Sequence, residues 1–315
     1  MTDPLAPTLL IGLPAIALLV LLLGALSYRR MIGMRIMDDA YIRARALEKG
    51  DVTEGQLALP WREESVESPR GYRVAVRALE GEEPRVAVFQ HGVAWSWIGM
   101  IRHMALFMEL GWTVVALDSR GHGASGGGRP SYGVYEKEDL RAVVDWALGA
   151  FPHSGGLALV GVSMGAASVL QYAPLDPRVD AVLADCPYSS AAAELDHRLR
   201  RSFVPFFLRP LVVRAADLIC RRREGFSLFD ANPGRAVLET SVPLLLVHGL
   251  DDDYVPWRMS ERMAEARRAA LPGAVTELRL VPGARHGRSL SADPAGYAAG
   301  LASFLAIALA ARGKG

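Results

Sequence analysis

The segment of residues 161–165, Gly-Val-Ser-Met-Gly, constrains this chain of 315 residues more than any other. It follows the apolar run 157–160 and precedes a run of small and apolar residues at 166–170. This order predicts a strand, a sharp turn and a helix, with Ser163 at the apex of the turn. The flanking glycines remove side chains where strand and helix nearly touch. A serine hydroxyl exposed in this way suits nucleophilic acyl transfer, provided that a base lies within reach.

Acidic residues and a histidine follow two later strands of the same kind. Residues 242–247 form a short apolar run that predicts a buried strand, and three aspartates follow at 251–253. Residues 275–281 predict another strand, and His286 lies in the turn beyond it. Groups that follow the carboxyl ends of parallel strands meet at one edge of the sheet. We therefore expect His286 to take the serine proton and one aspartate to orient the imidazole.

Two other histidines are interpreted as structural. His248 has the same chemistry as His286, but it ends the strand that supplies the acid, so we expect a structural loop histidine there. His122 lies between two glycines after a predicted strand at 113–117. That pattern is typical of a tight turn and does not favour a triad residue.

From about residue 50 onward, the chain resembles an α/β-hydrolase. Residues 91–127 are similar to the family's stretch from the oxyanion loop to the following turn, and residues 185–190 resemble a subgroup of small bacterial, often membrane-tethered, serine hydrolases. The family's acid falls in a pattern H-G-x-x-D-x-x-V-P, which here implies Asp252. Strands that alternate with helical stretches also predict a mostly parallel sheet with helices on both faces.

An oxyanion hole and a substrate pocket are expected beside Ser163. Preorganised N–H donors stabilise the charge that develops on the carbonyl oxygen in acyl transfer. One donor should be the backbone N–H of Met164 at the start of a helix, and the resemblance implies that Val93 supplies the second. We expect His91, Trp95 and Tyr188 to line the pocket. The alternative for Trp95 is that its indole packs in the core.

Composition excludes several classes of function. Lysine and arginine number 35 and aspartate and glutamate 34, so the net charge of +1 gives no nucleic-acid signature. Two cysteines, Cys186 and Cys220, make neither a disulfide framework nor a metal site. The glycines at 126–128 lack the Lys-Ser/Thr of a phosphate loop. We therefore expect no cofactor and no metal.

The N-terminus carries an uncharged apolar run at residues 5–26, long enough to cross a bilayer as a helix. A cleavable signal peptide is the alternative, but no basic residue precedes the run, whereas Arg29, Arg30 and Arg35 follow it. We therefore expect a single-pass anchor. By the positive-inside rule the catalytic domain faces the cytoplasm, with an extracytoplasmic domain as the alternative.

We divide the chain into an anchor at 1–30, a linker at 31–70 and a hydrolase domain at 71–315. Within the linker, residues 35–49 predict a helix, whereas residues 54–66 are expected to be irregular.

The regular alternation breaks between residues 184 and 243, where we expect a helical lid at about 187–240. It is rich in arginine and contains the apolar run 203–208. Such a mixture suits a membrane-facing surface. The alternative is a lid that packs its apolar face on the core while its arginines face water.

The resemblance and these residues imply a membrane-anchored serine hydrolase that acts on an ester or thioester of a small-molecule or lipid-like acyl group. A peptidase and an acyltransferase are alternatives on the same triad. A non-catalytic, membrane-tethered scaffold is the alternative from another class.

Overall fold

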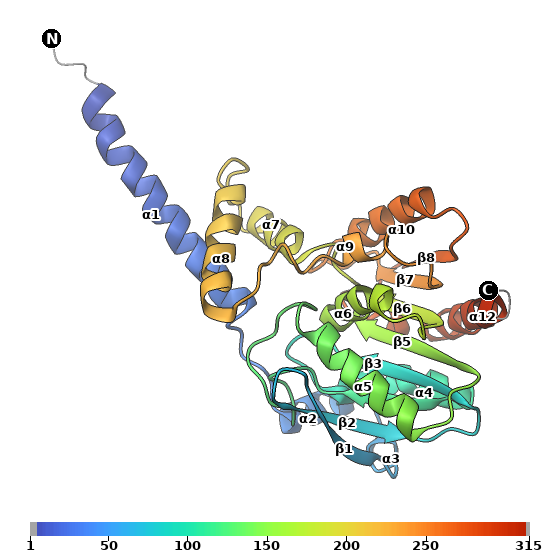
Figure 1. The fold of residues 1–315 in the computed structure, drawn as a ribbon. Helices are drawn as coiled ribbons and strands as arrows, with labels where there is room; N and C mark the ends of the chain where they lie inside the picture. The colour runs from blue at the N-terminus through green and yellow to red at the C-terminus, as the bar shows by residue number, and fades with distance from the viewer. Residues whose placement is uncertain (1–4, 313–315) are drawn as a thin grey trace.

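A computed structural model describes residues 5–312, so residues 1–4 of the predicted anchor and 313–315 of the predicted hydrolase domain lie outside it. Within this range, the core is an eight-stranded sheet of order β1-β2-β4-β3-β5-β6-β7-β8 (Figure 1). The first two pairings are antiparallel and the other five are parallel. The strands are β1 (Arg62–Glu67), β2 (Arg73–Leu79), β3 (Arg85–Gln90), β4 (Thr113–Leu117), β5 (Gly156–Val162), β6 (Ala181–Asp185), β7 (Leu244–Gly249) and β8 (Thr276–Val281).

Two apolar layers cover the two faces of the sheet, as the alternation of side chains along each strand requires. On β3, Phe89 joins the layer beneath one set of helices, whereas Val88 joins the opposite layer. The first set is α2 (Asp39–Glu48), α4 (Ile101–Glu109) and α12 (Pro294–Arg312); the second is α5 (Glu136–Ala150), α6 (Met164–Tyr172) and α10 (Arg258–Ala270). This confirms the predicted mostly parallel sheet with helices on both faces.

The segment predicted as a linker, 31–70, contributes directly to the folded core. The helix expected at 35–49 is α2, and its Ile42 and Ala46 are fully buried. The expectation of irregular structure over 54–66 was wrong, because this stretch holds α3 (Glu54–Leu57) and most of β1. The sequence of β1, Arg-Glu-Glu-Ser-Val-Glu, is almost wholly polar. An edge strand with a solvated face gives little of the apolar alternation by which strands are recognised.

The interval expected to form a lid, 187–240, carries the helices α7 (Ala191–Arg201), α8 (Arg209–Glu224) and α9 (Pro233–Ala236). Short elements complete the domain: η1 (Trp97–Met100), η2 (Ala173–Leu175) and α11 (Ser289–Ala292).

The N-terminal helix α1 (Leu5–Met31) packs along α8 (Figure 1). Their crossing is close, since a Cβ atom at Gly24 would lie 2.6 Å from the Cβ atom of Ala215. Tyr28 and Met31 at the end of α1 are buried in an apolar cluster with residues of α7 and α8. Over Pro14–Met31, α1 is long and apolar enough to cross a membrane, with 22% of that stretch buried; signal sequences pass the same test.

Candidate active site

Ser163 occupies the sharp turn between β5 and α6. Its backbone has φ 56° and ψ −114°, a strained combination that a non-glycine residue adopts only where the surrounding structure enforces it. The surroundings explain both glycines of the motif. A Cβ atom at Gly161 would collide with the carbonyl group of Gly165, and one at Gly165 would collide with the carbonyl oxygen of Gln90. The turn therefore requires glycine on either side of the serine.

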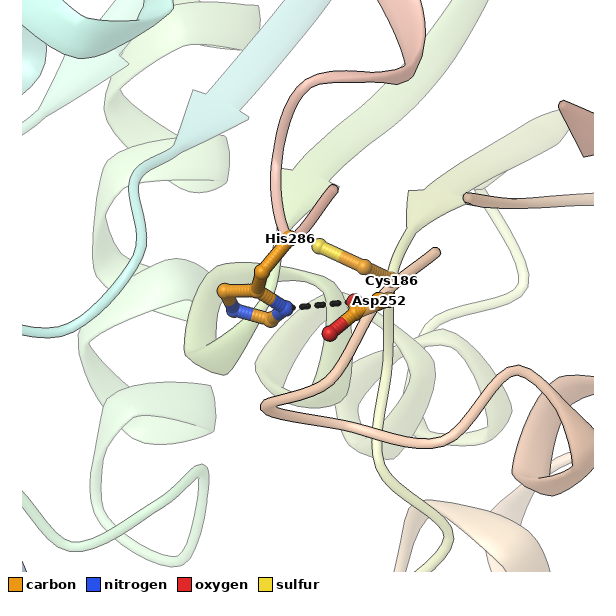
Figure 2. A group of neighbouring side chains, drawn as sticks. All are labelled: Cys186, Asp252 and His286. Atoms are coloured by element: carbon orange, nitrogen blue, oxygen red, sulfur yellow. Dashed lines mark hydrogen bonds and ion pairs between the residues drawn. The ribbon is translucent and has the colours of Figure 1, made fainter. Parts of the chain in front are cut away.

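The structure brings Ser163, His286 and Asp252 together in one chain of hydrogen bonds. The Nε2 atom of His286 lies 2.8 Å from the serine Oγ, and its Nδ1 lies 2.6 Å from Asp252 Oδ2. Figure 2 shows the imidazole facing the carboxylate. The three residues follow β5, β7 and β8, so the parallel sheet delivers all of them to one edge. With Nδ1–H donating to Asp252, Nε2 is left to accept the serine proton.

The carboxylate of Asp252 is fully buried but well satisfied. Its Oδ1 accepts the backbone N–H groups of Tyr254 at 2.9 Å and Val255 at 2.8 Å. Burial alone would raise the pKa of Asp252, but hydrogen bonds from His248 and His286 outweigh burial and hold that pKa below its usual range. The carboxylate is therefore ionised beside the imidazole.

The imidazole of His286 has a raised pKa. Burial alone would lower the pKa of His286, but the hydrogen bond to Asp252 and the charge of its carboxylate outweigh burial and place that pKa above its ordinary value. An imidazolium is therefore stabilised where a general base would hold the serine proton.

His248 is more closely tied to the site than the sequence indicated. It is fully buried at the end of β7, with Nδ1 2.7 Å from the hydroxyl of Ser260. Its Nε2 lies 2.9 Å from the carbonyl oxygen of Val255 and 3.2 Å from Asp252 Oδ2. It does not contact Ser163 in the described structure, but it is a second side-chain donor to the carboxylate.

The loop expected to form the oxyanion hole lies against the serine. Gly92 approaches so closely that a Cβ atom there would lie 3.3 Å from the Cβ atom of Ser163. Val93 lines the same cavity as Ser163, and Met164 is the first residue of α6. Both residues expected to supply backbone donors therefore lie next to Ser163.

Two neutral histidines hold this loop in place. His91 Nε2 accepts the backbone N–H of Ser119 at 2.9 Å, and His122 Nε2 accepts that of Ala94 at 3.0 Å. Burial is the main cause that lowers the pKa of each histidine to about 4, so both remain acceptors at neutral pH. His122 thus has the structural role expected of it.

The site opens into a cavity of about 270 Å³. Of the three predicted pocket residues, His91 and Trp95 line it, whereas Tyr188 does not. The placement of Tyr188 is a correction. Its ring is buried in the apolar cluster with residues of α1, α7 and α8, and its hydroxyl donates to the carbonyl oxygen of Tyr132 at 2.9 Å.

Other cavity residues had not been singled out from the sequence. The ring of Tyr254 lies 4.8 Å from that of His286, and a signal existed, since Tyr254 follows the acid by two positions. Lys49 and Asp51 come from the supposed linker, and Arg102 and Arg288 come from α4 and the histidine loop. No motif marks these four charges.

Cys186 lies beside Asp252 and His286 (Figure 2). Its sulfur, a carboxylate oxygen of Asp252 and a ring nitrogen of His286 lie within 4.8 Å of one another, close enough to hold a metal ion. However, burial raises the pKa of the Cys186 thiol, which disfavours the thiolate that a metal requires. His286 Nδ1 already bonds to Asp252. The arrangement is better suited to proton transfer than to metal binding.

Comparison with known proteins identifies the family. A model of the alpha/beta hydrolase fold matches residues 88–212. The chain is 30% identical over 266 residues to the uncharacterized protein YqkD of Bacillus subtilis, covering 82% of this chain and 86% of that protein. The chain therefore belongs to the alpha/beta hydrolase family.

Solved structures show the same fold. An esterase of Pyrococcus furiosus, Pf2001, is similar with a TM-score of 0.65 and 21% identity over 82% of this chain and 96% of its own. The alpha/beta hydrolase GrgF of Penicillium sp. sh18 has a TM-score of 0.59 and 19% identity over 80% and 100%. An acylaminoacyl peptidase of Pyrococcus horikoshii has a TM-score of 0.55 and 15% identity over 73% and 38%. At these identities the matches show a shared fold.

Proposed function

We propose that this protein is a membrane-anchored serine hydrolase that cleaves carboxylic esters or thioesters. The observation that carries the proposal is the continuous chain Ser163–His286–Asp252, with separations of 2.8 Å and 2.6 Å. A nucleophile, a base and a group that orients the base are the three parts that acyl transfer needs. The strained backbone of Ser163 adds to this, because strain of this kind gathers at active sites.

In the proposed reaction, Ser163 Oγ attacks the acyl carbon while His286 Nε2 takes the hydroxyl proton. The backbone N–H groups of Val93 and Met164 stabilise the oxyanion. His286 then passes its proton to the leaving alcohol or thiol, and the acyl group stays on the serine. A water molecule, deprotonated by His286, attacks the acyl-enzyme, and the acid leaves as the serine regains its proton.

The size of the cavity favours a small or medium acyl group. Its volume, about 270 Å³, lies just below the range for ligand pockets, about 300–1,000 Å³. Similarity to an esterase supports ester cleavage, and similarity to an acylaminoacyl peptidase keeps a peptide substrate as the second candidate.

The packing of α1 supports a retained anchor over a cleaved signal sequence. Removal of α1 would uncover the apolar lid surface that Gly24, Tyr28 and Met31 cover. The lid adds a second contact with the bilayer in our proposal. Phe203, Phe206 and Phe207, which are 93%, 75% and 63% exposed, form the loop between α7 and α8.

The exposed arginines Arg200 and Arg201 lie next to this loop. Aromatic side chains flanked by arginine suit the interface of an anionic membrane. The basic residues after the apolar run, Arg29 and Arg30, support a cytoplasmic catalytic domain.

A chain-length series of p-nitrophenyl esters tests the activity, with an acylated peptide p-nitroanilide as the peptidase arm. We expect wild type to hydrolyse the short and medium esters and Ser163→Ala to lose at least about a thousandfold in kcat/KM. Equal rates for wild type and Ser163→Ala would contradict the proposal. Faster cleavage of the anilide than of every ester would favour the peptidase.

A further inference from the structure

A cluster of charged side chains lines the cavity beside the triad. Asp51 bridges two guanidinium groups, with Oδ1 3.1 Å from Arg102 Nη1 and Oδ2 2.6 Å from Arg288 Nη1. Arg102 and Asp51 are largely buried, with side chains 15% and 14% exposed, and Arg288 is 33% exposed. Both carboxylate oxygens are thus occupied, and two cations share one anion.

Lys49 adds a third cation to the wall of the cavity. Its Nζ lies 5.9 Å from the centroid of the Trp95 ring, and its side chain is exposed. Among the residues that the structure describes, no carboxylate lies within salt-bridge distance of Lys49. Burial lowers the pKa of Lys49, the neighbouring charges of Arg288 and Arg45 lower it further, and the charge of Asp51 raises it. The ammonium group therefore lies among other cations and has no direct ionic partner in the described chain.

Among the described residues that line the cavity, one has an acidic side chain, Asp51, and three have basic side chains: Lys49, Arg102 and Arg288. An excess of positive charge at the wall of a cleft attracts anions and raises their local concentration. We propose that this cluster recognises an anionic group of the substrate, so that the site takes esters or thioesters carrying a carboxylate or phosphate near the cleaved bond. This inference rests on the proposed hydrolase activity.

The alternative is that the charges serve only to hold the histidine loop. Arg102 donates to the carbonyl oxygen of Gly287, next to His286, and Asp51 ties Arg288 to the same arginine. This explains Asp51 and both arginines, which we therefore leave unchanged. It does not explain Lys49, which has no ionic partner in the described chain, so Lys49 distinguishes the two interpretations.

Matched esters test the proposal and locate the anion. On the acyl side, the pair is p-nitrophenyl hemiglutarate and p-nitrophenyl hexanoate. On the alcohol side, the pair is the butyryl ester of 4-hydroxybenzoate and that of its methyl ester. Each pair differs mainly in one negative charge. We expect wild type to have the lower KM for the anionic member of at least one pair, and the pair affected shows on which side of the bond the anion lies.

Variants of Lys49 connect the preference to the cluster. Lys49→Ala should raise the KM for the preferred anion about threefold, and Lys49→Glu about tenfold, as single exposed charges contribute at this level. Lys49→Arg should retain the preference, and the KM for the neutral esters should change little in all three. Lys137→Glu on α5, outside the cavity, makes the same change in net charge and should leave both members of each pair unaffected.

The outcomes separate this inference from the proposed function. If neither member of any pair is hydrolysed by wild type, the hydrolase proposal fails. If neutral esters are hydrolysed but the anionic members have no lower KM, or Lys49→Glu leaves their KM unchanged, the hydrolase stands and recognition of an anion is refuted. Added salt should weaken the preference, since screening acts on exposed charges.

Discussion

His248 and His286 both reach the same oxygen of Asp252. The Nδ1 atom of His286 lies 2.6 Å from Oδ2, and the Nε2 atom of His248 lies 3.2 Å from it. Ser260 fixes the far nitrogen of His248 at 2.7 Å. The carboxylate is therefore held by a buried partner on one side and by the proposed general base on the other.

His248 should act as a positioning residue for Asp252. His248→Phe removes the second side-chain donor to the carboxylate, so we expect the pKa of Asp252 to rise. Losing a hydrogen bond to a charged group should lower kcat roughly tenfold and leave KM little changed. Steady-state kinetics across pH measure this. His248→Gln should recover part of the rate, and His153→Phe, at an exposed position, should have no effect. A loss confined to thermal stability would show that His248 is only structural.

The rising limb of the pH profile should report the raised pKa of His286. A general base must be neutral, so kcat/KM should fall as pH drops through the pKa of His286. Because the interaction with the Asp252 carboxylate outweighs burial, we expect the midpoint above the ordinary histidine value of about 6.5. The measurement is kcat/KM for a neutral ester from pH 5 to 9. A midpoint below 6 would contradict the arrangement described for His286.

Gly165 should not tolerate a side chain. In Gly165→Ala the new Cβ atom would collide with the carbonyl oxygen of Gln90, so β3 or α6 must shift. We expect a free energy of unfolding lower by about 2 kcal/mol or more and little remaining activity. Chemical denaturation measures the first quantity. Gly149→Ala is the matched control, because a Cβ atom there has no neighbour within 4 Å; its stability should be equal to or slightly above wild type.

The close crossing of α1 and α8 should be needed for a rigid lid. A Cβ atom at position 24 would lie only 2.6 Å from the Cβ atom of Ala215, and Gly24→Val adds two methyl groups to it. The two helices must therefore move apart. We expect faster proteolysis in the loop at 202–208 of the detergent-solubilised full chain. Leu21→Val, at a position 54% exposed, should leave the rate unchanged. Equal cleavage of the two variants would mean that α1 does not support the lid.

The residues of the proposed triad could be predicted because each follows a strong local pattern. Ser163 lies between close-packed glycines, and Asp252 and His286 each follow a buried strand. The same patterns predicted the parallel sheet, whose strands are continuous apolar runs. Local sequence is informative here because a buried parallel strand is apolar on both faces.

The parts that could not be predicted depend on contacts between distant segments. The polar edge strand β1 is defined by its pairing with β2, not by its own composition. Lys49 lines the cavity only because α2 packs against the core. Tyr188 does not line the cavity, and its hydroxyl instead donates to the carbonyl oxygen of Tyr132. The role of His248 follows from its contact with the Asp252 carboxylate, which the spacing of the two residues in the sequence does not reveal.

Labelling with a fluorophosphonate probe tests the central claim most directly, because only an activated serine reacts. The detergent-solubilised full chain is labelled, digested and mapped by mass spectrometry, with Ser163→Ala and His286→Ala alongside wild type. Our account predicts one modified peptide containing Ser163, no labelling of Ser163→Ala, and much slower labelling of His286→Ala. Well-folded wild type that remains unlabelled, or labelling that persists in Ser163→Ala, would contradict it.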